Sequence, residues 1–428
     1  MLSSVKWLYP GMRVKRWLLL IPVGLTVAIA GVVLLANIRL FSILEVVGTR
    51  AFETFGLDLR DPPVLIAVST GLIALGLLLM FISLRQVVRS ITSVVSPEAQ
   101  GKLADVVFRR RYLSQGQRIV VIGGGTGLST MLRGLKQYTS NIVAVVTVTD
   151  DGGSSGRLTR DMGVLPPGDI RNCLVALADA EPMMTELFQY RFGEGPDGLD
   201  GHSFGNLLIA AMTRITGDFE KAVKETSNIL AIRGRVLPST LEAVKLQAEL
   251  EDGTFREGET NIVTAPAAIK HVMLHPSDAR PLDETLRAIE LADCVVIGPG
   301  SVYTSIVPNL LVSGIPDAID AADAVKVFVC NVMTQPGETD GYSASDHVRA
   351  IERHVERKVF THVLVNQKEP SLELLEKYAG ENQYFVEPDI VRIRDMGYRP
   401  VVGDYISETD VVRHDPEKLA NAILRLVY

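Results

Sequence analysis

The sequence predicts an α/β fold, a Rossmann-like parallel sheet with helices on both faces, preceded by a transmembrane helical hairpin. Near-continuous Val and Ile runs recur along the chain with helical stretches between several of them, which is typical of a parallel sheet covered on both faces. Two uncharged apolar stretches precede the first of these runs. We therefore divide the 428 residues into a transmembrane hairpin at 1–90, a basic linker at 91–116 and a cytosolic Rossmann-type domain at 117–428.

The hairpin comes first in the chain, with predicted spans at 17–38 and 64–84. Each span has roughly the 20 apolar residues that a helix needs to cross a hydrocarbon core about 30 Å thick. A signal peptide is the alternative for the first span, and a buried core helix is the alternative for the second. The first stretch is too long for the apolar region of a signal peptide, and buried helices rarely run this far without a strongly polar residue.

Positive charges set the expected topology of the hairpin. Lys and Arg are in excess before the first span and after the second, whereas the three Arg of the connecting segment are offset by four acidic residues. Such a distribution places both ends of the hairpin in the cytoplasm. We therefore expect a multi-pass protein of the cell membrane whose N-terminus and C-terminal domain are cytoplasmic.

Charge and cysteine content exclude several classes of protein. The whole chain has a net charge of −7, and residues 1–98 carry 9 basic and 5 acidic residues, so the remainder has a net charge of −11. A body this acidic is a poor non-specific binder of nucleic acid, and we expect no nucleic-acid partner. The three cysteines lie far apart without a CxxC pair, which excludes a disulfide scaffold and a structural zinc site as organising features.

The cytosolic domain should alternate strands and helices. Strands are expected at the Val- and Ile-rich runs 118–122, 142–149, 294–297, 325–330 and 362–365. A helix is expected at 128–138, and a β-hairpin at 244–260 with Asp252-Gly253 as its turn. Because ligands of open α/β sheets bind outside the carboxyl ends of the strands, candidate functional residues are sought at those ends.

The first strand ends in a glycine-rich loop, GGGTGLST. Its Gly124, Gly125, Thr126 and Gly127 would let backbone N–H groups approach a phosphate, and the following helix N-terminus adds a favourable dipole. The loop does not fit G-x-G-x-x-G, which argues against an NAD-dependent oxidoreductase, and the absence of GxxxxGK[ST] excludes a P-loop NTPase. A tight turn without a ligand is the alternative, but five small residues in a row exceed what a turn needs.

Two later strand ends carry further candidates. The run IGPGS offers a second backbone cradle for phosphate through Gly298 and Gly300, with Ser301 as a hydroxyl donor. The run NVMTQPGETDGY offers Asn331, Thr334 and Gln335, whose amide and hydroxyl groups suit recognition of a base or a sugar. Because the two glycine cradles lie at the ends of separate strands, we expect a diphosphate to bridge them.

The second strand ends in TDDGGSSGR, which contains two adjacent carboxylates. Asp150 and Asp151 could hold Mg²⁺ through water, or they could accept hydrogen bonds from sugar or ribose hydroxyls, and we favour the hydroxyls. Ser154 and Ser155 add hydroxyl groups, and Arg157 adds a planar cation for a phosphate. The alternative is a flexible acidic loop. Apart from this possible Mg²⁺, no cofactor is expected.

Two helix starts complete the candidate site. In LPPGDIRN, Asp169 is placed to cap a helix at 170–178, with Arg171 and Asn172 in its first turn, where they could face a ligand. In GHSFGN, His202 and Asn206 are four residues apart and should share a helix face. The N-cap of that helix is a sufficient structural role for Ser203, whereas no structural role accounts well for His202 and Asn206.

These motifs together resemble one known family. IVVIGGGTGLSTMLRGL, TVTDDGGSSGRL, LPPGDIRNCLVALAD, GHSFGNLL, GPGSVYTSIVPNLL and NVMTQPGETDGY closely resemble the YvcK-type gluconeogenesis factors, which belong to the CofD-like superfamily of 2-phospho-L-lactate transferase. The resemblance covers roughly residues 117–428 and is specific, because the motifs are long and occur in order. The chain departs from typical members in carrying the N-terminal hairpin, which bears on where the protein resides and not on the pocket.

The resemblance implies a function that the residues alone do not. It implies a Rossmann-like fold, a nucleotide-type pocket with a UDP-sugar as ligand, a homodimer, and a role in cell-envelope precursor balance and cell shape during growth on gluconeogenic carbon. The transferase branch implies the alternative, a phosphotransferase acting on a nucleotide-activated donor. We expect a membrane-tethered nucleotide-sugar-binding regulator, because no acceptor-binding signature is evident; Asp150 and Asp151 are the candidate catalytic residues if the chain is an enzyme.

Overall fold

The computed structural model describes residues 15–36, 50, 52, 54, 62–95, 108, 111–179, 182–193, 199–408 and 411–427. Contacts divide the chain into two compact units, Met1–Arg110 and Arg111–Tyr428. The first contains the apolar N-terminal helices, and the second contains the sheet and the candidate site.

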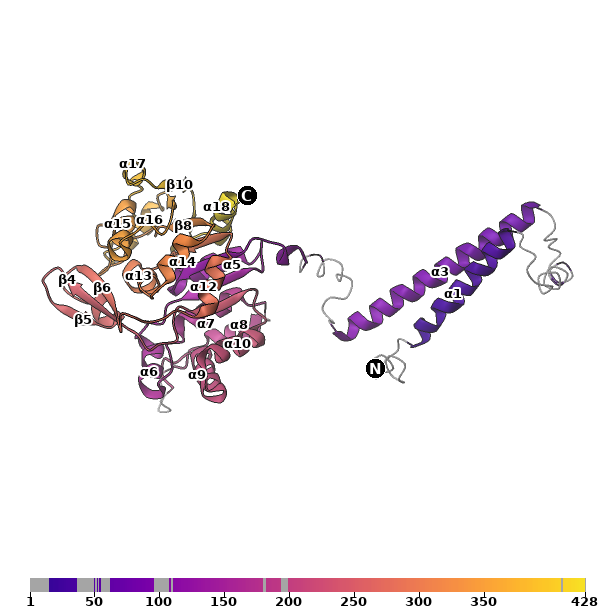
Figure 1. Cartoon of the computed structure of the whole chain (residues 1–428), viewed down its shortest axis with the longest axis horizontal. Coiled ribbons are helices and arrows are strands. Elements are labelled where there is room, and N and C mark those ends of the chain that lie inside the picture. The colour runs from indigo at the N-terminus through magenta and orange to yellow at the C-terminus, as the bar shows by residue number, and fades with distance from the viewer. Residues whose placement is uncertain are drawn as a thin grey trace. The chain divides into compact units, whose positions relative to one another are not determined.

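The N-terminal unit is an antiparallel pair of helices, α1 (Lys15–Leu35) and α3 (Pro62–Val95) (Figure 1). Both are long and apolar enough to cross a membrane, over Trp17–Leu35 and Pro62–Ser90. The helix α3 continues beyond the predicted span and into the predicted linker, since nothing in its sequence interrupts a helix before Pro97. Half of the ten flanking cations that set the expected topology, and just over half of the linker, lie outside the described residues.

Small residues at seven-residue intervals form the seam of this pair. Gly24 on α1 faces Gly76 on α3, Gly31 faces Ser69, and the hydroxyl of Ser83 donates to the backbone oxygen of Trp17. The two glycines of α1 and Ser69, Gly76 and Ser83 of α3 are all buried. A Cβ at Gly76 would lie 2.5 Å from the backbone oxygen of Gly24, so the two backbones approach too closely for a larger residue. Small residues of this kind allow close packing of membrane helices, and a seven-residue period favours a left-handed crossing.

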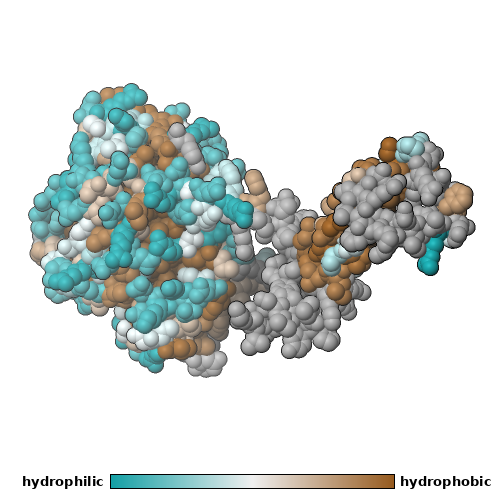
Figure 2. Space-filling view, turned by 45° about the vertical axis from the view of Figure 1, so that its right-hand side comes forward, coloured by the Kyte–Doolittle hydropathy of each residue, from teal (hydrophilic) through white to brown (hydrophobic). Residues whose placement is uncertain are grey.

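Large apolar side chains of the pair point away from the seam. Leu19 is 58% exposed and Phe81 is 65% exposed. The described residues of α1 and α3 are accordingly mostly brown in Figure 2, whereas the visible face of the other unit is mostly teal and white. The hairpin therefore buries its small residues and exposes its large ones, the reverse of a water-soluble helix pair.

The second unit is built on a seven-stranded parallel sheet with the order β10-β9-β8-β7-β1-β2-β3. The strands are β1 (Ile119–Gly123), β2 (Ile142–Val146), β3 (Arg235–Pro238), β7 (Cys294–Ile297), β8 (Val325–Val329), β9 (His362–Asn366) and β10 (Arg399–Gly403). The strand order reverses at β1, which pairs with β2 on one side and β7 on the other. This is the doubly wound Rossmann-type arrangement that the sequence predicted, and the point of reversal is where such sheets bind ligands.

Helices cover both faces of the sheet because successive strand residues point to opposite sides. In β1, Val120 and Ile122 join one apolar core while Ile119 and Val121 join the other. The first core includes residues of α12 (Asp283–Glu290), α14 (Ile315–Ala321) and α15 (Ala344–Val355). The second includes residues of α5 (Gly125–Leu135), α7 (Gly168–Leu177) and α18 (Pro416–Val427).

The predicted β-hairpin exists and belongs to a small three-stranded sheet. Strands β4 (Lys245–Leu250) and β5 (Phe255–Glu257) pair around the turn at Asp252-Gly253, and β6 (Ile269–His275) pairs with the other side of β4. The short helix α11 (Glu259–Val263) lies between β5 and β6. The remaining elements are α6 (Gly153–Met162), α8 (Pro182–Gln189), α9 (Phe204–Thr216), α10 (Phe219–Leu230), the π-helix η3 (Val302–Ile306), α13 (Val307–Leu310), α16 (Leu372–Ala379), α17 (Ile390–Asp395), β11 (Ile406–Glu408) and β12 (Val412–His414).

Strands β3 and β10 were not predicted from the sequence, and they form the two edges of the large sheet. Each contains a proline, Pro238 or Pro400, and β10 is only partly buried. Edge strands tolerate proline because one side of the backbone needs no ladder hydrogen bond, and they lack the long apolar run of a central strand. The pattern that reveals buried strands therefore misses these two.

Candidate functional site

The larger of two adjoining pockets in the second unit lies where β1 and β7 end, and it encloses about 510 Å³. Both predicted glycine loops line it, through Gly124, Gly125, Thr126, Gly127, Gly300 and Ser301. The two loops come together because their strands are neighbours in the sheet, a pairing that the sequence order does not reveal.

The two loops touch through their backbones. A Cβ at Gly127 would lie 2.8 Å from the backbone oxygen of Pro299, and a Cβ at Gly300 would lie 3.3 Å from that of Gly124. Gly125 has φ +67°, in the left-handed region that favours glycine. Side chains at these positions would therefore push the loops apart or fill the space between them, so the wall of the pocket must be backbone.

Helix α5 begins inside the glycine loop, at Gly125, three residues before the predicted start. Its N-cap, Gly124, supplies no capping side chain, so the first backbone N–H groups of the helix depend on other acceptors. The carboxylate of Asp169 accepts one hydrogen bond, from the N–H of Gly125. The positive end of the α5 dipole thus faces the pocket, where it favours negative charge.

The predicted capping role of Asp169 is wrong. Helix α7 begins at Gly168 with Pro167 as its N-cap, so Asp169 already lies in the first turn and its side chain makes no cap hydrogen bond there. The carboxylate instead reaches the β1 loop, and a Cβ at Gly124 would lie 2.5 Å from its Oδ2. Asp169 therefore links the start of α7 to the start of α5 and lines the pocket.

Four acidic side chains influence one another around this pocket. Burial, and next the charge of Asp150, raises the pKa of Asp169 to about 6. Burial, and next the charges of Asp150 and Asp169, raises the pKa of Glu259 to about 9. Burial raises the pKa of Glu338 to about 7. Such acids can hold a proton near neutral pH, which reduces their repulsion of an anionic ligand and makes them able to exchange a proton with one.

The residues predicted after β8 shape the β7 loop. Asn331 accepts a hydrogen bond from the N–H of Gly300 (3.3 Å) and donates one to its carbonyl (2.9 Å). Gln335 donates to the hydroxyl of Ser301 (2.8 Å). Thr334 accepts from the N–H of Tyr384 (2.9 Å). Asn331, Thr334 and Gln335 all line the pocket, so they hold the second cradle in place while facing a ligand.

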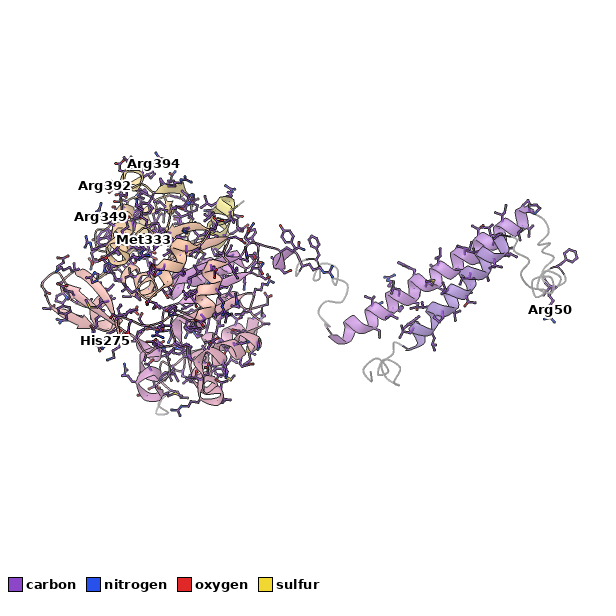
Figure 3. All side chains as sticks on the ribbon, viewed as in Figure 1. Arg50, His275, Met333, Arg349, Arg392 and Arg394 are labelled. Atoms are coloured by element: carbon purple, nitrogen blue, oxygen red, sulfur yellow. The ribbon has the colours of Figure 1, made fainter. Side chains whose placement is uncertain are left out.

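C-terminal segments close the far end of the larger pocket, and apart from Met333, which lies within the predicted NVMTQPGETDGY run, none of the residues there was predicted. The lining there comes from Met333, labelled in Figure 3, and from Tyr378, Gln383, Val412, Arg413 and His414. The hydroxyl of Tyr378 accepts from the N–H of Val412 (3.0 Å), which ties α16 to β12. An aromatic ring, an amide and a cation are together suited to a base or a sugar.

A second pocket of about 250 Å³ adjoins the first and shares Asp150, Asp169 and Asn172 with it. The predicted residues Ser154, Ser155 and Asn206 line this second pocket, together with Arg171 and Arg191. The predicted N-cap is confirmed, since the hydroxyl of Ser203 accepts from the N–H of Asn206.

His202 and Asn206 meet at Ser154 instead of sharing a helix face. His202 precedes α9, so it is not within the helix that the prediction assumed. Its Nδ1 lies 2.9 Å from the Ser154 hydroxyl, to which the Asn206 amide donates at 3.1 Å. Burial, and next the charge of Arg157, lowers the pKa of His202. His202 thus orients the hydroxyl of Ser154, which lines the second pocket, but does not itself line either pocket.

Three other predicted residues point elsewhere. Asp151 accepts hydrogen bonds from the N–H and the hydroxyl of Thr260, at 3.0 and 2.9 Å, and so fixes the start of α11. Arg157 donates to the backbone oxygen of Asp200. Gly298 has φ +78° and packs against Ile306 and Val329. None of these three lines either pocket.

The two adjacent carboxylates therefore do not form a pair. Asp150 accepts from the N–H of Gly152 (2.9 Å) and lines both pockets, whereas Asp151 turns to the small sheet. Throughout the part of the chain that the structure describes, no group of three or more His, Cys, Asp or Glu is arranged to hold a metal ion. Adjacent residues after a strand tend to point in opposite directions, so a pair of neighbouring carboxylates in the sequence does not imply a pair in the site.

Glu259 and Arg191 are the main lining residues that sequence reasoning missed. Glu259 is the first residue of α11, and it lines the larger pocket. The contact between α11 and the loop after β2 depends on the hydrogen bond from Thr260 to Asp151. Arg191 follows α8, in a stretch without a recognisable motif. No local signal could have found either residue, because both reach the site only through the packing of distant segments.

Comparisons with known proteins agree with this fold. A family model described as 2-phospho-L-lactate transferase CofD matches residues 119–406. A protein of Bacillus subtilis named "Gluconeogenesis factor" is 48% identical over 316 residues, covering 74% of this chain and 99% of its own length. A relative from Nostoc sp. is 50% identical over 425 residues, covering 98% of this chain and 92% of its own. The Nostoc alignment thus includes the N-terminal unit, and the Bacillus protein corresponds to the second unit alone.

A crystal structure also matches the second unit. The protein, a member of the UPF0052 family from Bacillus halodurans, is 49% identical and superposes with a TM-score of 0.70. The match covers 72% of this chain and 99% of the other. The family model matches more than half of the chain, and the crystal structure matches nearly all of the second unit. The strand order also places both glycine loops at one pocket. The chain is therefore a member of the CofD family.

Proposed function

We propose that the protein is a membrane-tethered regulator of gluconeogenic growth, and that a UDP-sugar occupies the larger pocket. Through this ligand it would influence the balance of cell-envelope precursors and cell shape. The role in gluconeogenic growth is supported by membership of the CofD family and by the name of the 48% identical Bacillus subtilis relative.

The contact between the two glycine loops carries the proposal for the ligand. The loops meet at the reversal point of the sheet, where a Cβ at Gly127 would lie 2.8 Å from the backbone oxygen of Pro299, and the N-terminus of α5 adds its dipole. Successive backbone N–H groups and a helix N-terminus are the standard protein device for phosphate groups. A diphosphate placed there would leave the base or sugar to the far end, beside Tyr378 and Gln383.

Calorimetry tests the ligand class directly. Full-length protein in detergent should bind UDP-glucose and should not bind NAD⁺ with similar strength, because the β1 loop lacks the dinucleotide fingerprint. Tighter binding of NAD⁺ than of UDP-glucose would contradict the proposal and favour an oxidoreductase.

The proposed tether rests on the outward-facing apolar side chains of α1 and α3. Leu19 and Phe81, for example, are more than half exposed, which suits lipid and not water. Reporter fusions at residue 53 and at the C-terminus should report opposite compartments, with the C-terminus cytoplasmic. Identical results from the two fusions would contradict a hairpin that crosses the membrane twice.

A homodimer is the proposed assembly of the second unit. Met183 on α8, Ile215 on α9 and Ile229 on α10 are 71%, 77% and 47% exposed, and α9 packs against both α8 and α10. Analytical ultracentrifugation should show a dimer that Ile215→Glu weakens. A monomer in the wild-type protein at all concentrations would contradict it.

A phosphotransferase is the second candidate function, and the adjacency of the two pockets favours it. Asp169 lies between them and can change its protonation near neutral pH, as a general base or acid requires. A transferase would consume UDP-glucose or a related donor when a second substrate is present, whereas a regulator would return the ligand intact from a prolonged incubation.

A further inference from the structure

The second pocket contains features that the proposed nucleotide-sugar site does not explain. It encloses about 250 Å³ and is lined by Asp150, Gly152, Gly153, Ser154, Ser155, Gly168, Asp169, Arg171, Asn172, Arg191 and Asn206. Among the side chains that line the larger pocket, Arg413 at the far end is the one Lys or Arg. Positive charge at the carboxyl ends of β1 and β2 is thus concentrated in the smaller pocket.

Two helix N-termini open into this pocket without side-chain caps. Helix α6 begins at Gly153 after Gly152, and helix α7 begins at Gly168 after Pro167; in neither does the N-cap side chain accept a hydrogen bond. Both helices are 10 residues long, so each has a developed dipole with its positive end at the pocket. Their first N–H groups are the kind of donors that bind oxyanions.

Arg171 provides an independent indication of an anion. It is only 7% exposed and lines the pocket, yet its guanidinium is held by neutral acceptors. It donates to the Ser203 hydroxyl, to Asn206 Oδ1 (3.1 Å) and to Asn172 Oδ1 (2.7 Å), and its Nε has no hydrogen-bond partner. A buried cation normally has a counter-charge in contact with it.

Arg191 adds a second cation to the same wall. It donates to the backbone oxygen of Gly201 (3.1 Å) and lines the pocket. Among the described residues, neither Arg171 nor Arg191 forms an ion pair with a carboxylate. Burial, and next the charge of Arg191, lowers the pKa of Arg171, and the charges of Asp169 and Asp150 offset this in part. An anion between them would relieve that repulsion.

The two carboxylates that line the pocket reach it from the side of the β1 and β2 loops. Asp169 accepts from the N–H of Gly125 in the β1 loop. Asp150 accepts from the N–H of Gly152 through Oδ1 at 2.9 Å, and its Oδ2 faces Gly168 at the start of α7, where a Cβ would lie 2.8 Å from it. They border the pocket on the side of the larger one, because both residues line both pockets. An oxyanion would therefore be seated against Arg171 and the α6 N-terminus, away from the α7 N-terminus that Asp150 faces.

We propose that the second pocket binds the phosphate group of a second, small ligand beside the nucleotide sugar. The proposal rests on the proposed function in so far as it assigns the diphosphate of the UDP-sugar to the loops after β1 and β7. The guanidinium of Arg171 and the N-terminus of α6 hold the phosphate, and Arg191 closes the outer side. The protein then responds to two metabolites and not to one.

Competition and substitution together test the proposal. Binding of inorganic phosphate to the full-length protein in detergent is measured by calorimetry, first alone and then with saturating UDP-glucose. Phosphate should bind in both conditions. Arg191→Gln should weaken phosphate binding about tenfold or more, because it removes a charge-assisted hydrogen bond, and should leave the affinity for UDP-glucose within twofold of wild type.

Arg160→Gln is the matched control, since Arg160 lies on the same helix α6, near its other end, and lines neither pocket. It should leave phosphate binding unchanged. Arg171→Lys is the second test variant, because it keeps the positive charge but loses the planar set of N–H donors of the guanidinium. It should weaken phosphate binding. Its melting temperature shows whether the fold is intact.

The outcomes separate the two proposals. Phosphate binding that is absent in wild type, or unchanged in both Arg191→Gln and Arg171→Lys, overturns the second site. Displacement of phosphate by UDP-glucose, one for one, also overturns it and places the diphosphate of the nucleotide sugar in this pocket instead. A protein that binds phosphate as described but does not bind UDP-glucose supports the anion site and contradicts only the proposed function.

Discussion

The two adjoining pockets of the second unit are made of different parts of the chain. The larger one is walled at its centre by the backbone of two glycine loops, which approach so closely that a Cβ at Gly127 would lie 2.8 Å from Pro299. The smaller one is walled by side chains, among them Arg171 and Arg191, and by two helix N-termini. Both constructions are suited to an anion, but they depend on the sequence in different ways.

The difference teaches which kind of site a sequence reveals. A backbone-walled site requires residues without side chains, so it leaves a run of glycines that can be recognised without knowing the fold. A site that is walled by side chains can take them from segments far apart in the sequence, provided that the fold packs those segments together. Here Arg191 comes from the end of α8 and Asn206 from α9, and neither stretch has a composition that indicates a ligand.

The largest expected effect comes from placing a side chain in the backbone wall. Gly127→Val should weaken UDP-glucose binding by about a hundredfold or more, because the new side chain meets the backbone of Pro299 and must separate the loops. Calorimetry measures the affinity, and a melting curve checks that the protein is folded. Gly193→Val is the control, since a Cβ at Gly193 meets no atom within 4 Å. Equal affinity in the two variants would mean that the loops do not form the site.

The second prediction concerns the acid that the small sheet adds to the larger pocket. Burial, and next the charge of Asp150, raises the pKa of Glu259 to about 9, from an ordinary value of 4.5. Between those values the folded protein keeps a proton that the unfolded chain releases, so stability falls as the pH rises. Glu259→Gln cannot ionise and should be more stable than wild type at pH 8, by on the order of 2 kcal/mol.

Urea unfolding of residues 111–428 measures this effect, because this part is a compact unit and corresponds to nearly the whole length of the Bacillus relatives. The gain should disappear near pH 4, where the unfolded chain also keeps the proton. Glu251→Gln, at an exposed position in the turn of the small sheet, should show no such dependence. A gain that is the same at both pH values would contradict the assignment.

The third prediction concerns Asp169, which borders both pockets. Its pKa is raised to about 6, chiefly by burial, so it loses its charge as the pH falls below that value. UDP-glucose keeps its negative diphosphate throughout this range, and its binding should strengthen several-fold from pH 8 to pH 5 as the repulsion disappears. Asp169→Asn should bind with an affinity that hardly changes with pH. A wild-type affinity that falls on acidification would show that the carboxylate of Asp169 attracts the ligand's donors.

The smallest effect is expected at Asp151, beside the pocket-lining Asp150. Asp151 holds the N–H and hydroxyl of Thr260 at the start of α11, so Asp151→Ala should cost about 1 kcal/mol of stability, as the loss of a helix cap does. The affinity for UDP-glucose should stay within about twofold of wild type, whereas Asp150→Asn should change it. A large loss of affinity in Asp151→Ala with normal stability would contradict this division of roles.

The sequence revealed most of the scaffold. Five of the seven strands of the large sheet were predicted from their apolar runs, and the turn at Asp252-Gly253 was located from its residue types. The hairpin helices were found from length and absence of charge. These features are local, because each depends on which residues follow one another and not on which distant ones they meet. The edge strands with Pro238 and Pro400 lacked that local pattern.

The sequence by itself also determined the glycine loops after β1 and β7, since no other residue fits where backbone must touch backbone. Only the tertiary structure decided that these two loops face one pocket, because that depends on β1 pairing with β7 across 171 residues from Gly123 to Cys294. It also decided that Asp150 faces the ligand space while Asp151 does not, and that Glu259 and Arg191 join the site. Side-chain direction and the approach of distant segments are set by packing, which a local pattern of residues does not contain.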